Sequence, residues 1–307
     1  MTILSDDFVL PFEIERSGLR GRLVRVGPAI DLILKRHEYP PVIAALLGEA
    51  LVLACCLAST VKFDDGIFTF QARGNGGPVR ILVADITSDG QFRGYVGFDA
   101  GKLDDDSQHM SAAKLFGGGH VAFTVDQGGD FDRYQGIVEL RGETLSDSVH
   151  HYFRQSEQIA SALKTVSQRD SHGRWRGTAI MVQKLPDEVI QKAPPEEVAE
   201  MVEADEGYRT AAILLGSATQ EEMADPDLSA EELLLRLFHE DGVRVYDKRP
   251  LHAGCRCKLD GVENVLRQFG RERMDEFKVD GVVTVTCEFC TETRVFDDEA
   301  LDSIYAG

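Results

Sequence analysis

The chain has 307 residues, 43% hydrophobic and 28% charged, which is the balance of a soluble globular protein with roughly two domains. Its 33 Lys and Arg against 52 Asp and Glu give a formal net charge of −19, which disfavours nucleic acid and anionic lipid as partners. Residues 1–12 lack the basic start and long apolar stretch of a signal or transit peptide. We therefore predict a cytoplasmic protein that binds neither nucleic acid nor a membrane.

An apolar stretch from Val42 to Val61 is the first strong pattern, with Glu49 as its only charge. It is about as long as a bilayer span, but its Ala and other small residues favour close packing, and a central carboxylate is unfavourable in lipid. We predict a buried core helix, with a membrane span as the alternative. Cys55 and Cys56 lie within it, and we expect both to be buried thiols without a chemical role.

Short β-favouring runs between turn residues predict several strands in the first 186 residues. A helical period also occurs near residues 145–155. Few helical crossovers separate the strands, so we predict an α+β domain with largely antiparallel sheets over residues 1–186. The predicted strands are at residues 67–70, 79–83, 92–96, 134–138 and 178–182.

The next segment, residues 187–240, is strongly acidic, with 15 acidic and 3 basic side chains and a net charge of −12. Helix-forming residues alternate there with breaks such as Pro194–Pro195 and Asp225–Pro226. Repulsion among the carboxylates weakens such helices. We predict an acidic helical linker that must dock on another part of the chain to stay ordered; an ordinary solvated connector is the alternative.

The remaining residues, 241–307, are predicted to form a small C-terminal domain. Just before it, Ser229 and Glu232 match a capping box, which predicts a helix at residues 230–239. Downstream, the patterns predict a strand at 243–246, a helix at 262–269 and a strand at 282–285.

Four cysteines carry the clearest chemical signal: Cys255-Arg-Cys257, then 29 intervening residues, then Cys287-Glu-Phe-Cys290. Two close thiol pairs are typical of a tetrahedral Zn²⁺ site, and in a small domain metal binding and folding are one event. We predict one zinc ion per chain held by all four cysteines, with an iron–sulfur cluster or unrelated thiols as alternatives. His252 is a spare ligand candidate, although four thiolates already complete a tetrahedron.

The spacing leaves open whether such a zinc ion is only structural. Arg256 and Lys258 beside the first pair favour the thiolate form, which reacts with oxidants, and oxidation within each pair would expel the zinc. A zinc module that binds nucleic acid or a protein partner is a second hypothesis, disfavoured by the net charge. A thiol oxidoreductase that uses Cys287 and Cys290 is a third.

Motifs of the common enzyme classes are missing from the sequence. The Gly-rich segments at 73–78 and 117–120 lack the spacing of a dinucleotide- or phosphate-binding loop, and neither a Gly-x-Ser-x-Gly nor a His-Glu-x-x-His motif occurs. ATP-driven and hydrolytic functions therefore lack their usual signatures, and only the resemblance described next implies that the chain is not an enzyme.

Several motifs together resemble the heat shock protein 33 family of redox-regulated chaperones, over essentially the whole chain. They are the four cysteines, the Leu-Leu-x-Arg-Leu-Phe-His-Glu run ending at Glu240, the Tyr-Phe-x-x-Ser-Glu-Gln segment from Tyr152 to Gln158, and Gln183-Lys-Leu-Pro186. The resemblance implies an α+β N-terminal domain, a helical linker and a C-terminal zinc domain. It also implies a strand from Ser156 to about Val166, where periodicity alone suggests a helix.

The resemblance further implies a cytoplasmic, ATP-independent holdase that is reduced and zinc-bound at rest. Under oxidative stress, Cys255–Cys257 and Cys287–Cys290 disulfides would form and zinc would be released. The linker would then unfold, the chain would form a homodimer, and unfolding client proteins would be held until other chaperones refold them. Which surface the folded linker covers, and which residues contact clients, stay open.

Overall fold

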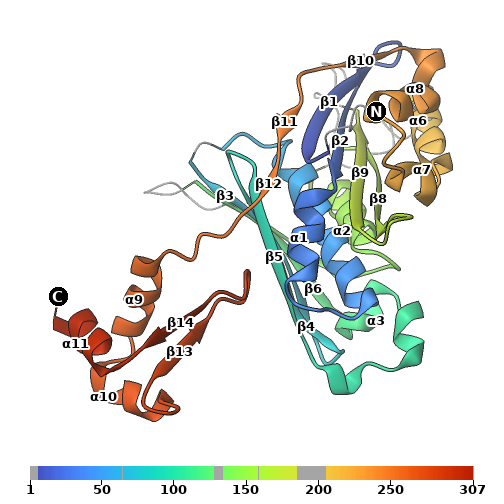
Figure 1. Cartoon of the computed structure of the whole chain (residues 1–307). Helices are drawn as coiled ribbons and strands as arrows, with labels where there is room; N and C mark the ends of the chain where they lie inside the picture. The colour runs from blue at the N-terminus through green and yellow to red at the C-terminus, as the bar shows by residue number, and fades with distance from the viewer. Residues whose placement is uncertain (1–5, 64, 128–133, 158, 185–204, 307) are drawn as a thin grey trace. The chain divides into compact units, whose positions relative to one another are not determined.

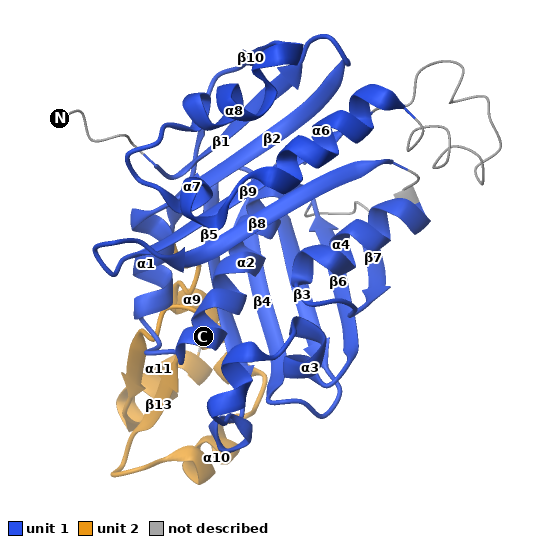
Figure 2. Ribbon diagram, turned by 90° about the vertical axis from the view of Figure 1, so that its right-hand side faces the viewer, with its two compact units in different colours: residues 1–253 blue, residues 254–307 orange. Residues whose placement is uncertain are grey.

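The structure is a computed structural model that describes residues 6–63, 65–127, 134–157, 159–184 and 205–306 (Figure 1). The chain divides into two compact units, residues 1–253 and 254–307 (Figure 2). The three-part division predicted at residues 186 and 240 stays a prediction. Residues 187–204 of the predicted linker lie outside the described residues.

Sheet A of the first unit has the strand order β10-β1-β2-β9-β8, with β11 also paired to β1, and every pairing is antiparallel. Apolar side chains alternate between its two faces, as the strand geometry requires: Phe12 and Leu23 belong to one core cluster, and Val9 and Val24 to the other. The sheet is therefore covered on both sides. Its strands are β1 (Phe8–Ile14), β2 (Leu19–Val26), β8 (Ser161–Arg169), β9 (Trp175–Gln183), β10 (Val243–Val245) and β11 (Arg249–Pro250).

Sheet B has the order β12-β5-β4-β3-β6-β7, and all its pairings are antiparallel except the short one between β12 and β5. Gly117, with φ 68°, ends the helix before β6, so a turn lies there as expected. The α+β fold with largely antiparallel sheets is confirmed. The strands are β3 (Ile67–Gly74), β4 (Val79–Thr87), β5 (Gln91–Phe98), β6 (Gly119–Asp126), β7 (Tyr134–Glu139) and β12 (His252–Ala253).

Helix α2 (Pro41–Ala58) lies between the two sheets (Figure 2). Among the described residues it is the one helix long and apolar enough to cross a membrane, but 78% of it is buried inside the protein. The predicted core helix is therefore confirmed. The other helical segments around it are α1 (Pro28–Lys35), η1 (Ala100–Lys102), η2 (Asp105–His109), α3 (Ala112–Phe116) and α4 (Leu145–Tyr152).

The segment after α4 differs from the expected strand start. The helix continues as a π-helical turn, η3 (Phe153–Glu157), and β8 begins only at Ser161. Tyr152 packs against Phe123 with ring centroids 5.0 Å apart, which keeps this turn against sheet B. The strand predicted from Ser156 is therefore correct for residues 161–166 and wrong for its first residues.

Three helices cover the face of sheet A that points away from α2: α6 (Glu206–Ser217), α7 (Gln220–Ala224) and α8 (Ala230–Phe238) (Figure 2). The predicted capping box of α8 is present, because Ser229 Oγ accepts from Glu232 N at 3.1 Å and Glu232 reaches back to Ser229 N. These helices share one core cluster with the sheet. Docking of the acidic linker is thus confirmed for its described part.

Residues 239–253 run from α8 along the edges of both sheets (Figure 1). After the short turn η5 (His239–Asp241), β10 and β11 pair with β1, and β12 pairs with β5. The strand predicted at 243–246 is therefore present, and it belongs to the first compact unit.

The second unit has a small core of six buried residues. Its helices and strands follow the predicted order, with the helix expected at 262–269 starting three residues earlier. The core residues are Leu266, Met274, Val283, Phe296, Leu301 and Ile304. The elements are α9 (Leu259–Arg267), α10 (Arg271–Met274), η6 (Asp275–Phe277), β13 (Val283–Thr286), β14 (Thr293–Phe296) and α11 (Asp298–Ala306).

Candidate metal centre

The four C-terminal cysteines lie on two loops of the second unit. Cys255 and Cys257 occupy the extended segment before α9, and Cys287 and Cys290 occupy the tight turn between β13 and β14. Thr291 N donates to Cys287 O at 2.9 Å, and Cys287 N donates to Glu292 O at 2.9 Å. These bonds close the turn so that both of its thiols face the other loop.

The two loops bring the sulfur atoms together. All four Sγ atoms lie within 4.8 Å of one another, with Cys255 and Cys287 3.7 Å apart and Cys257 and Cys290 3.4 Å apart. A tetrahedral Zn²⁺ with Zn–S bonds of about 2.3 Å sets its sulfur atoms about 3.8 Å apart. The site therefore has the number, type and spacing of donors that a tetrahedral metal ion needs.

The first loop is also tied to the hairpin by a second contact. Arg294 of β14 donates from Nη2 to Cys257 O at 3.1 Å. A metal ion held by all four thiols would join the two loops far more strongly than this bond does.

All four thiols are partly exposed, so small oxidants can reach them. Burial, followed by the neighbouring thiols, raises the pKa of Cys257, and burial also raises the pKa of Cys290. The expected effect of Arg256 and Lys258 on the thiolate does not dominate. A bound cation reverses this balance, because a coordinating thiol loses its proton.

The other sulfur and imidazole candidates lie elsewhere. His252 belongs to β12 and is not part of the cluster, which consists of the four cysteines among the described residues. Cys55 and Cys56 are fully buried in α2, and burial raises the pKa of Cys56 to about 12. The predicted inert role of these two thiols agrees with their burial.

These differences predict a pattern of thiol alkylation. In the reduced, metal-free chain, iodoacetamide should modify four thiols and leave Cys55 and Cys56 unmodified until a denaturant unfolds the first unit, because buried thiols neither ionise nor meet the reagent. Mass spectrometry of peptides with and without denaturant measures this. Equal labelling of all six cysteines under native conditions would contradict the assignment.

Comparison with known proteins assigns the chain to a family. A protein-family model described as Hsp33 protein matches residues 7–297. The chain belongs to the Hsp33 family. The resemblance noted in its motifs is thereby confirmed, and the four cysteines form the metal-type cluster of an Hsp33 chain.

Individual relatives agree with the Hsp33 assignment. A 33 kDa chaperonin of Caulobacter vibrioides is 39% identical over 299 residues, which is 95% of each chain, and one of Pseudomonas fluorescens is 33% identical over 310 residues, covering 100% of this chain and 96% of the relative. The crystal structure of a 33 kDa chaperonin, a heat shock protein 33 homolog from Thermotoga maritima, matches with a TM-score of 0.79 over 98% of both chains at 20% identity. It supports the fold. Hsp33 is a family of chaperones and not of enzymes.

Several side chains of the Hsp33 sheet A that the sequence analysis did not single out bind the backbone of α6–α8 or of the connections between these helices. Thr178 Oγ1 donates to Met223 O at 2.7 Å, Lys164 Nζ donates to Gly216 O at 2.6 Å, and Arg25 Nη1 donates to Leu228 O. Arg25 could have been noticed in the sequence. It lies on the same face of β2 as the apolar Leu19 and Leu23, so a charged residue occurs where the alternation predicts a buried apolar one.

Proposed function

We propose that this chain is a redox-regulated, ATP-independent holdase that is inactive when reduced and zinc-bound. The observation that carries the proposal is the cluster of four partly exposed thiols within 4.8 Å in a unit with a very small apolar core. Such a unit depends on its metal for stability, so losing the metal unfolds it. The zinc ligands are Cys255, Cys257, Cys287 and Cys290.

Oxidation removes those ligands in a balanced reaction. In each pair, two thiolates give two electrons to one peroxide molecule, which takes up two protons and leaves as water, while an S–S bond forms. The pairs are Cys255–Cys257 and Cys287–Cys290, the members closest in sequence. A disulfide sulfur is a poor zinc ligand, so one zinc ion per chain leaves.

The face of sheet A supplies a surface for clients. In the resting state α6, α7 and α8 bury apolar residues of this face, including Leu10, Phe12 and Ile180. Unfolding of the acidic linker, residues 187–240, would expose these side chains together with the apolar faces of the helices themselves. Large exposed apolar surfaces bind unfolding proteins and second copies of the same chain.

The resulting activity suits a cytoplasmic stress protein. The active form is a homodimer that holds unfolding clients during oxidative stress and passes them to other chaperones for refolding. This protein has no role on nucleic acid or membranes, in keeping with its net charge of −19.

The test follows zinc and client aggregation in one sample. The reduced, zinc-loaded chain is treated with peroxide at elevated temperature while a chromogenic chelator reports zinc and light scattering reports a denaturing client. We expect release of about one zinc per chain to coincide with suppression of aggregation. Zinc that stays bound, or that leaves without any holdase activity, would reduce the site to a structural metal centre.

A further inference from the structure

Arg25 is a buried charge beneath the linker helices. It lies on β2 with 3% of its surface exposed, and its guanidinium donates from Nη1 to Leu228 O, in the connection between α7 and α8. Nη2 is buried without a hydrogen-bond partner. Among the described residues no carboxylate oxygen lies within 4.0 Å of it. The linker connection at Leu228 therefore lies directly against this buried cation.

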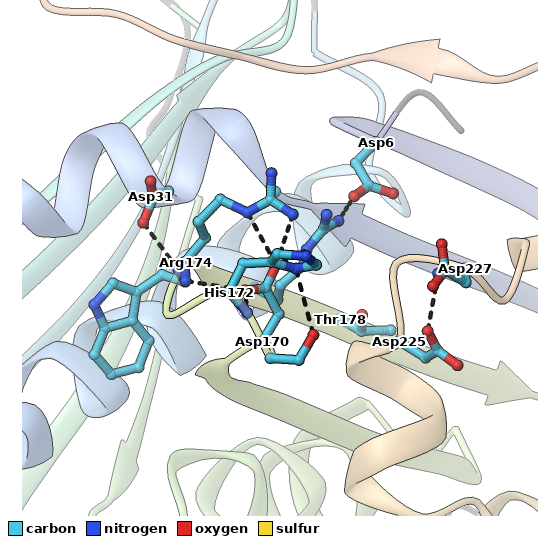
Figure 3. Close-up of polar contacts among 12 residues, drawn as sticks. Asp6, Asp31, Asp170, His172, Arg174, Thr178, Asp225 and Asp227 are labelled. Carbon is cyan, nitrogen blue, oxygen red and sulfur yellow. Dashed lines mark hydrogen bonds and ion pairs between the residues drawn. The ribbon is translucent and has the colours of Figure 1, made fainter. Parts of the chain in front are cut away.

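A second arginine on the same face of sheet A differs from Arg25 in having two carboxylates within ion-pair distance. Arg176 pairs with Asp170 at 3.3 Å and also with Asp6, and both carboxylates are almost completely buried. Figure 3 shows Asp6 and Asp170 on this face, with Asp225 and Asp227 of the linker connection nearby. Arg25 has no such pair and is attracted only at longer range by Asp225 and Glu231.

Arg25 and Thr178 are expected to have opposite effects on the stability of the docked linker. Burying a cation costs much more than burying a neutral polar group, and a single backbone carbonyl recovers only part of that cost. Thr178 on the neighbouring strand makes the opposite kind of contact: its neutral hydroxyl satisfies Met223 O at 2.7 Å with little desolvation cost. When the linker lifts off, Arg25 exchanges one backbone carbonyl for full hydration, whereas Met223 O only exchanges the Thr178 hydroxyl for water, so release favours Arg25 and not Met223.

We propose that Arg25 is a release residue: its buried charge, which lacks a close carboxylate partner, destabilises the docked linker and so sets how easily α7 and α8 leave sheet A. Its part in regulation rests on the proposed function, whereas its effect on linker opening does not. Thr178 acts in the other direction and holds the linker in place.

The test is hydrogen–deuterium exchange of the amides of α8 in the reduced, zinc-loaded, full-length chain. In Arg25→Met, exchange should be about tenfold slower than in the wild type, a change that corresponds to about 1.4 kcal/mol in the opening equilibrium. Arg25→Lys keeps the charge and should exchange at least as fast as the wild type. Thr178→Val, which leaves Met223 O without a hydrogen-bond partner, should exchange faster.

The control is the exchange of amides in β3 and β4. These amides exchange only when the whole unit unfolds, so their rates separate linker opening from global unfolding.

Opposite results overturn the proposal. Faster exchange in Arg25→Met would mean that Arg25 holds the linker in place, and unchanged exchange would mean that its charge has no effect on opening. Slow exchange in Arg25→Lys would mean that side-chain shape and not charge decides. Arg25→Leu is a second neutral variant if the methionine variant does not fold. A wild-type chain that fails to hold clients after oxidation, combined with slow exchange in Arg25→Met, would refute the proposed function and leave the role of Arg25 in place.

Discussion

Replacing Cys287 by serine is expected to unfold the second compact unit, residues 254–307, and to leave sheets A and B of the first unit folded. The variant loses one of the four thiol ligands that join the two loops of the site. Structural zinc contributes about 10–16 kcal/mol of apparent binding free energy in small zinc domains, about as much as the six buried apolar side chains at about 1.5–3 kcal/mol each, and those six must already offset the conformational entropy of the unit. Zinc content and amide exchange of β13 and β14 measure the effect.

The matched control is Glu288→Gln in the same turn. Glu288 is exposed and offers no thiol, so this variant should keep its zinc and its protected amides. Exchange in β3 and β4 should be unchanged in both variants, because these strands belong to the other compact unit. Retention of zinc and of protected β13 and β14 amides in Cys287→Ser would show that this unit does not depend on its fourth thiol.

Local patterns were enough to predict much of the fold. Strands such as β3 to β5 and β9 have β-favouring residues between turn residues, and helix α8 has its capping box in the sequence, so these elements could be located without long-range information. The metal-type cluster was predicted for a similar reason, because the two cysteine pairs are close in sequence and only their meeting in space had to be assumed.

The rest depends on contacts between distant residues. Strands β10 and β11 are short, and their pairing with β1 joins residues more than 200 positions apart, which no local pattern encodes. The helical turn at Phe153–Glu157 agrees with the local periodicity and not with the strand start that the resemblance implied, and Tyr152 beside it packs on Phe123 of sheet B. The role of Arg25 requires knowledge of what covers it.

Replacing Phe238 by alanine is expected to activate the reduced, zinc-loaded chain without oxidant. Phe238 is 1% exposed at the end of α8, and its ring lies 6.0 Å from that of Phe12 on sheet A. Removing a buried phenylalanine side chain costs about 3–5 kcal/mol, so the opening equilibrium of the linker should shift at least a hundredfold. Light scattering of a denaturing client with the reduced variant measures the gain of activity.

Leu235→Ala is the matched control, because Leu235 lies on the same helix and is 56% exposed. It should leave the resting chain inactive. The comparison separates two parts of the mechanism, since Phe238→Ala should open the linker while all four thiols keep their zinc. If proteolysis shows the linker of Phe238→Ala to be open and the reduced variant still fails to hold a client, then the face of sheet A is not the client surface. In that case oxidation must do more than uncover it.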